Sequence, residues 1–167
     1  MSAPDSNAAQ HSSDGDGDFF FARSENKVDE KRRVAIPSTW RRGQASLRLL
    51  LLPLPKRNWR PGCLMGTTMA RFLEMVREVR KMNFMDDRAD SVRRQLMSRA
   101  VEIETDSAGR ICVPDDQLKA VEIRDRVTLV GMGEWFELWS PERLALADAA
   151  DLERPDDPFS LLKGRMS

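Results

Sequence analysis

Between residues 19 and 150, apolar residues fall in short runs that are separated by charged or proline-containing segments. Runs of this length, bounded by glycine or proline, predict strands buried in a core and are too short for most helices. Proline ends two of the runs because it cannot donate to a sheet ladder. The expected strands are Phe19–Val28, Val34–Ile36, Leu47–Leu54, Cys63–Thr67, Val101–Glu104, Ile111–Val113, Arg126–Val130 and Trp135–Trp139.

Helical patterns follow each group of strands. Thr68 can cap a helix whose apolar positions recur at helical spacing, and a second helix is expected over Asp87–Met97. A single helical turn is expected after each strand-ending proline, at Ser38–Arg42 and Asp115–Val121. Ser140 followed by proline predicts the start of the last helix, because serine caps well and proline suits the first helical position.

The chain repeats itself. Val28–Pro37 aligns with Thr105–Pro114 at a constant offset of 77 residues, with an Asp, an Arg, an apolar triplet and a Pro at matching positions. A half made of so few strands exposes apolar edges, so the two copies are expected to complete one core. The predicted organisation is a disordered acidic extension over residues 1–18, repeats over 19–85 and 86–150, and a flexible tail over 151–167.

The formal net charge of zero at first argues against a nucleic-acid partner. The charge is unevenly distributed, however. Residues 1–18 contain four aspartates and no basic residue, whereas residues 23–60 contain eleven basic and three acidic residues, a net charge of plus eight. The basic residues are Arg23, Lys27, Lys31, Arg32, Arg33, Arg41, Arg42, Arg48, Lys56, Arg57 and Arg60. A basic segment of this kind is typical of a surface that binds phosphate.

Several classes of protein are disfavoured. No apolar run approaches the roughly 18 residues that span a bilayer, and no signal peptide is evident, so a soluble, cytoplasmic protein without membrane contact is expected. The only histidine is His11, and no metal-ligand spacing or phosphate-cradling loop occurs. We therefore expect no enzyme, no metal and no cofactor. Cys63 and Cys112 are each predicted to be small buried residues.

The repeated Asp-x-x-x-Arg loops, Asp29–Arg33 and Asp106–Arg110, are the best candidates for function. The aspartate can accept backbone N–H bonds and fix the turn, while Gly109 supplies a positive φ at little cost. An arginine aimed outward can then contact phosphate or a guanine edge. Two readings remain open from the residues alone, namely nucleic-acid binding and a purely structural turn with an exposed ion pair.

These residues give the sequence a resemblance to the MraZ family, within the AbrB-like superfamily. The resemblance rests on the following segments: Val28–Pro37, Ser98–Pro114 and Val127–Pro141. It implies a β-rich α+β fold of two tandem AbrB-like swapped-hairpin repeats, which form a double-split β-barrel-like pseudo-dimer with flanking helices. It also implies a ring-like homo-oligomer that binds direct repeats in double-stranded promoter DNA of the division and cell-wall gene cluster, as a nucleoid-associated repressor.

The DNA contacts implied by the resemblance carry over to Asp29, Lys31, Arg32, Arg33, Asp106 and Arg110. The chain departs from the family pattern at Arg32, which replaces the usual loop glycine and would cost roughly 1 kcal/mol of backbone strain. The basic connection Pro53–Gly62 is a second departure. The competing hypothesis is a self-assembling scaffold or protein-interaction module that keeps the fold without specific DNA binding.

Overall fold

The computed structural model describes residues 19–55 and 61–162. Each predicted strand and helix is present, with ends shifted by a few residues. The strands are β1 (Arg23–Lys27), β2 (Arg33–Ala35), β3 (Arg48–Pro55), β4 (Pro61–Thr67), β5 (Val101–Glu104), β6 (Arg110–Cys112), β7 (Arg126–Gly131) and β8 (Phe136–Trp139). The α-helices are α1 (Ser38–Arg41), α2 (Met69–Arg80), α3 (Asp87–Gln95), α4 (Asp115–Ala120) and α5 (Pro141–Leu152), with 3₁₀ turns η2 (Met97–Arg99) and η3 (Pro158–Leu162). The predicted acidic extension lies outside the described residues.

The main sheet is built by exchange of strands between the two repeats. Its order is β1-β7-β8-β4-β3-β5, and every neighbouring pair is antiparallel. The first strand of repeat one, β1, pairs with β7 of repeat two, and β5 of repeat two pairs with β3 of repeat one. Each repeat thereby covers an edge that the other would leave open. The α+β class is confirmed, whereas closure of these strands into a barrel stays a prediction.

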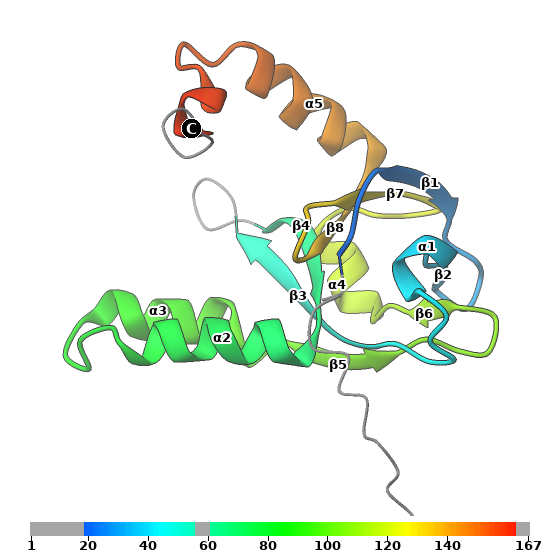
Figure 1. Ribbon diagram of the computed structural model, residues 1–167, viewed down its shortest axis with the longest axis horizontal. Helices are drawn as coiled ribbons and strands as arrows, with labels where there is room; N and C mark the ends of the chain where they lie inside the picture. The colour runs from blue at the N-terminus through cyan, green and yellow to red at the C-terminus, as the bar shows by residue number, and fades with distance from the viewer. Residues whose placement is uncertain (1–18, 56–60, 163–167) are drawn as a thin grey trace, which may run out of the picture.

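Strands β2 and β6 form a separate two-stranded ribbon around a local two-fold relation. Val34 lies opposite Ile111, its equivalent at the offset of 77 residues. Two further backbone bonds extend the relation, because Ile36 N donates to Gly109 O and Val113 N donates to Arg32 O, both at 2.9 Å. The ribbon therefore joins the two repeats at equivalent positions, next to α1 and far from the α2–α3 hairpin (Figure 1).

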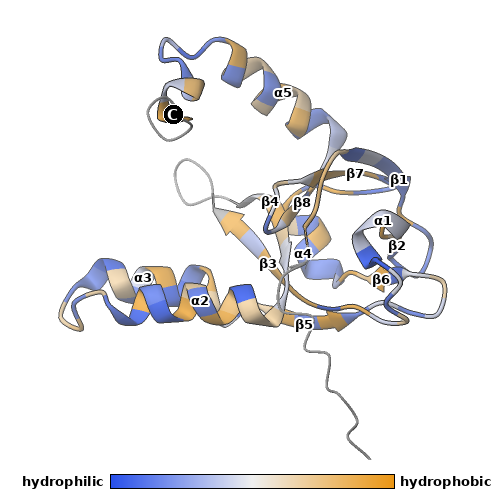
Figure 2. Cartoon of the chain, in the orientation of Figure 1, coloured by the Kyte–Doolittle hydropathy of each residue, from blue (hydrophilic) through white to orange (hydrophobic). Residues whose placement is uncertain are grey.

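The core lies where the apolar sides of the exchanged strands meet, with α1 and α4 packed beside them (Figure 2). An aromatic cluster occupies its middle, with the Phe20 and Trp40 rings 5.0 and 5.2 Å from the Phe136 ring. Gly66 of β4 faces this cluster, and a Cβ there would lie 2.2 Å from the Phe136 ring. Burial of each such large side chain contributes about 1.5–3 kcal/mol to the stability of the fold.

The longer helices begin as the sequence predicts and extend away from the sheet (Figure 1). Thr68 caps α2 by accepting from Arg71 N at 3.3 Å, and Ser140 caps α5 by accepting from Arg143 N at 3.1 Å. Helix α2 has no buried residue. Across the described ranges no helix combines the length and apolar character that a bilayer-crossing segment needs.

One prediction about the cysteines is confirmed and the other is wrong. Cys63 is buried, but Cys112 is exposed. Side chains alternate between the two faces of a strand, and in β6 the middle residue, Ile111, faces the core. Cys112 therefore lies on the outer face of the ribbon, where its thiol donates to the carbonyl of Lys31 at 3.4 Å.

Candidate nucleic-acid interface

The first Asp-x-x-x-Arg loop is closed by its aspartate. One carboxylate oxygen of Asp29 accepts from Lys31 N at 2.9 Å and from Arg33 N at 2.8 Å, while the other accepts from Arg33 Nε at 2.6 Å. The backbone adds two bonds, from Asp29 N to Arg33 O and from Arg32 N to Asp29 O. A single side chain thus satisfies the turn and fixes the direction in which Arg33 leaves the strand.

The second loop has the same bonds at the equivalent positions. Asp106 accepts from Ala108 N at 3.0 Å and from Arg110 N at 2.9 Å through one oxygen, and from Arg110 Nε at 2.9 Å through the other. The backbone bonds from Asp106 N to Arg110 O and from Gly109 N to Asp106 O recur as well. The predicted role of the aspartate in fixing each turn is therefore confirmed for both copies.

These hydrogen bonds shift the acidity of both aspartates. The pKa of the Asp29 carboxyl lies below its ordinary 3.8, chiefly because the backbone N–H of Arg33 donates to it and the Arg33 guanidinium also pairs with it. The pKa of Asp106 is lowered in the same way, chiefly by the backbone N–H of Arg110. Both carboxylates are therefore ionised at neutral pH and hold their arginines by charge-assisted bonds.

Strand pairing brings the two arginines to one face of the ribbon. Arg33 lies opposite Cys112, and Arg110 lies opposite Ala35. Residues directly opposite each other, and residues two apart on one strand, point to the same side. Arg33 and Arg110 consequently share the outer face, whereas Val34 and its partner on β6 are buried beneath it. The sequence predicted both arginines as candidates but could not show that they lie together.

Each arginine is held along its stem and open at its tip. The Arg33 side chain is 32% exposed and that of Arg110 is 35% exposed. In each, Nε is bonded to the loop aspartate, and no residue in the described part of the chain bonds to the two terminal nitrogens. A guanidinium held in this way presents two parallel N–H donors, which is the geometry that suits a phosphate or a guanine edge.

The two loops differ at the position before the arginine. Gly109 has φ +76°, as predicted for a loop glycine, and Arg32 adopts the same left-handed conformation with φ +60°. The chain therefore accommodates a side chain at this turn without a change in the turn's bonds. Lys31 and Arg32 are both exposed, so the first loop carries two cations besides Arg33. The Arg32 cation also lowers the pKa of Asp115, whose main perturbing partner is Lys119.

Sequence reasoning missed one cation beside the second loop. Arg41, at the end of α1, lies directly over Gly109, and a Cβ at residue 109 would fall 2.4 Å from the guanidinium carbon of Arg41. Gly109 is buried under this side chain. The sequence counted Arg41 in the basic segment, but no local pattern could show that it reaches into the other repeat.

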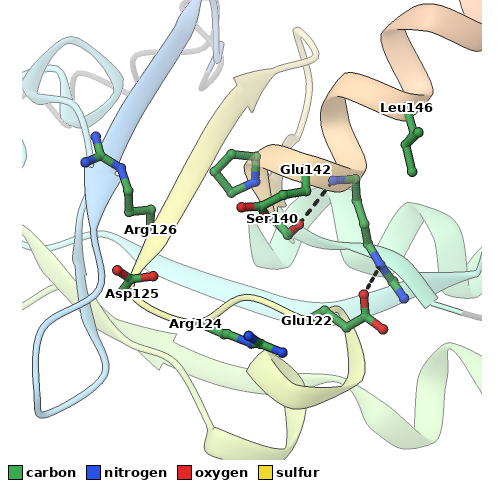
Figure 3. Close-up of a pocket in the computed structure, with 9 residues that line it drawn as sticks. Glu122, Arg124, Asp125, Arg126, Ser140, Glu142 and Leu146 are labelled. Carbon is green, nitrogen blue, oxygen red and sulfur yellow. Dashed lines mark hydrogen bonds and ion pairs between the residues drawn. The ribbon is translucent and has the colours of Figure 1, made fainter.

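A pocket of about 430 Å³ lies apart from the loops, where α5 begins (Figure 3). Arginines and acidic residues line it in equal number, and Arg143 Nε is paired with Glu122 at 3.0 Å. Its charges balance, so it offers no concentrated positive surface. Nowhere in residues 19–55 and 61–162 do three or more potential metal-ligating side chains gather.

Comparison with known proteins adds a relationship to this geometry. A family model described as "MraZ protein, putative antitoxin-like" matches residues 96–145. Three relatives bear the name "Transcriptional regulator MraZ". The one from Hydrogenovibrio crunogenus is 31% identical over 140 residues, covering 83% of this chain and 86% of the relative. The Rhodospirillum rubrum protein is 33% identical, covering 75% and 81%, and that of Roseiflexus castenholzii is 27% identical, covering 75% and 83%.

Proposed function

Because the chain belongs to the MraZ family, we propose that it is a transcriptional regulator that binds double-stranded DNA through the outer face of the β2–β6 ribbon. The relatives' name places them in transcriptional regulation. The observation that carries the proposal for this chain is the common outer face of Arg33 and Arg110, each oriented by its own aspartate. A structural turn alone would not need two equivalent arginines on one exposed face.

The ribbon has the form that a DNA groove accepts. The major groove of B-DNA is wide enough for a two-stranded β-ribbon, and arginine is the side chain that pairs bidentately with guanine. Lys31 and Arg32 extend the cationic surface at the first loop, where they supply contacts to the phosphate backbone. Asp29 and Asp106 take part as positioning residues, because their carboxylates bond to the arginine Nε and leave the terminal nitrogens for DNA.

We further propose that the chain acts as a nucleoid-associated repressor in the cytoplasm. Its target would be direct repeats in the promoter of the division and cell-wall gene cluster, bound by a ring-like homo-oligomer. Helix α2 supports self-assembly, because it has no buried residue within the described chain and its Met69 and Leu73 side chains are 40% and 43% exposed. Neighbouring subunits would present their loops to successive repeats, so a modest affinity of each subunit would be raised by effective concentration.

Fluorescence anisotropy with the DNA upstream of the protein's own gene tests the proposal. Affinity should fall steeply with rising salt, and Arg33→Ala or Arg110→Ala should each reduce it strongly while the thermal melt stays near that of the unaltered protein. Arg77→Ala on the exposed side of α2 is the matched control, because it removes one arginine far from the ribbon. Equal, weak binding of every duplex by all four proteins would refute promoter-specific binding.

A scaffold without DNA binding is the second candidate function. The exposure of Phe84 and Met85, each 83% accessible at the tip between α2 and α3, favours an interaction surface on this arm. Light scattering separates the two functions when it is combined with the anisotropy experiment. A defined oligomer that shows no salt-dependent DNA binding would favour the scaffold.

A further inference from the structure

The Arg41 side chain has an unusual environment for a cation. Its Nε is buried and has no hydrogen-bond partner, and its terminal nitrogens bond to none of the residues in the described ranges. The side chain as a whole is half-buried against the second loop. Arginines in such positions are normally paired with a carboxylate or a carbonyl, because a partly desolvated charge without an acceptor is costly. An acceptor from outside the chain would relieve that cost.

The relation between the repeats shows what Arg41 adds. Position 32 of the first loop corresponds to position 109 of the second, so one carries an exposed cation and the other a buried glycine. The guanidinium of Arg41 occupies the space in which a side chain at residue 109 would begin. At the equivalent position in repeat two stands Leu118, which is buried and leaves the first loop uncovered.

From this arrangement we propose that Arg41 of the first repeat is a phosphate-binding residue of the second loop. It supplies across the repeats the additional positive charge that Lys31 and Arg32 supply within the first loop. The two loops thus present comparable cationic surfaces by different routes, although the residues between Asp106 and Arg110 carry no charge of their own. The bound group is the phosphate of a nucleic-acid backbone, so the inference rests on the proposed DNA binding.

The test measures DNA affinity as a function of salt for the full-length protein and its Arg41→Met and Arg41→Lys variants. Arg41→Met keeps an apolar stem but removes the charge, and we expect about a 5- to 10-fold loss of affinity for specific and unrelated duplexes alike. The slope of log affinity against log salt should become shallower by about 0.9, the value for one phosphate contact. Arg41→Lys should keep most of the slope, since a point charge suffices for a phosphate.

Arg77→Met and Arg110→Ala distinguish the possible failures. If Arg41→Met behaves like Arg77→Met while Arg110→Ala abolishes specific binding, the inference is overturned and the proposed function stands. If Arg110→Ala also has no effect, the proposed function fails as well. A loss of affinity in both Arg41 variants with an unchanged salt slope would show that the side chain only supports the loop, which also overturns the inference. Should Arg41→Met fail to fold, the slope retained by Arg41→Lys is compared with that of Arg41→Gln.

Discussion

Gly109→Ala is the most informative single perturbation of this protein. Gly109 combines a positive φ of +76° with the close approach of the Arg41 guanidinium, so one added methyl group tests the backbone and the overlying cation together. The chain also offers a matched control at Gly133, which has φ +87° and no atom within 4 Å of the position that its Cβ would take. Gly133→Ala therefore imposes backbone strain without a steric clash.

The expected magnitudes follow from these two environments. A left-handed conformation costs an alanine about 1–2 kcal/mol, and the loss of glycine's freedom in the unfolded chain offsets about 0.4–1 kcal/mol of that cost. Both variants should therefore lose about 1 kcal/mol of stability from the backbone, or about 2–4 °C in Tm for a chain of this size. At residue 109 the methyl group must also displace Arg41, whose guanidinium carbon lies 2.4 Å from the new atom. The flexible side chain can swing away, so this displacement adds little to the loss of stability.

Function should separate the two variants where stability does not. Denaturant melts measure the stability of Gly109→Ala and Gly133→Ala, and anisotropy with promoter DNA measures their affinity. Only Gly109→Ala should weaken DNA binding, by about the factor lost in Arg41→Met, because both changes remove one phosphate contact from the second loop. In the double variant Gly109→Ala/Arg41→Met, the two losses should not add, since they act on one contact.

Two results would refute this reasoning. Equal DNA affinities for Gly109→Ala and Gly133→Ala would show that the position of Arg41 does not matter for binding. Additive losses in the double variant would show that the methyl group acts through the loop itself and not through the overlying arginine.

The remaining predictions concern the aspartates and the exposed thiol. Asp106→Asn should preserve the turn, because an amide oxygen still accepts the backbone bonds of Arg110, yet weaken DNA binding by releasing the guanidinium from its charged partner; a variant with unaltered affinity would contradict this. Because the folded pKa of Asp106 is lowered from 3.8, its stabilising contribution should be complete above that pH and be lost as pH falls through the lowered value, so an NMR titration of the carboxyl carbon should show a midpoint below 3.8. A thiol reagent should modify Cys112 and spare Cys63 in the folded protein, and bound DNA should slow the reaction; labelling that DNA leaves unchanged would argue against the ribbon face.

Local interactions explain why so much of the architecture could be predicted from the sequence. The bounds of the strands follow from apolar runs and prolines, and the caps at Thr68 and Ser140 involve residues only a few positions apart. The Asp-x-x-x-Arg turn is equally local, since every hydrogen bond that closes it joins residues at most four apart. The repeat at an offset of 77 residues also carried the equivalence of the two loops.

The error at Cys112 came from relying on the usual burial of cysteine over the alternation of the strand. Ile111 is the larger apolar residue of the β6 triplet and takes the buried side, which forces its neighbours Arg110 and Cys112 outward. The alternation was visible in the sequence and could have corrected the prediction. The direction of the triplet needed only the assumption that the middle residue faces the core.

By itself, the sequence determined the elements, the repeat and the conformation of each loop, because these depend on side chains and backbone groups that are neighbours along the chain. Only the tertiary structure decided that the repeats exchange strands, that Arg33 and Arg110 share one face, and that Arg41 covers Gly109. These three features depend on the register between strands about 77 residues apart in sequence. Register of that kind is selected by the burial of both repeats' apolar faces at once, which no local segment encodes.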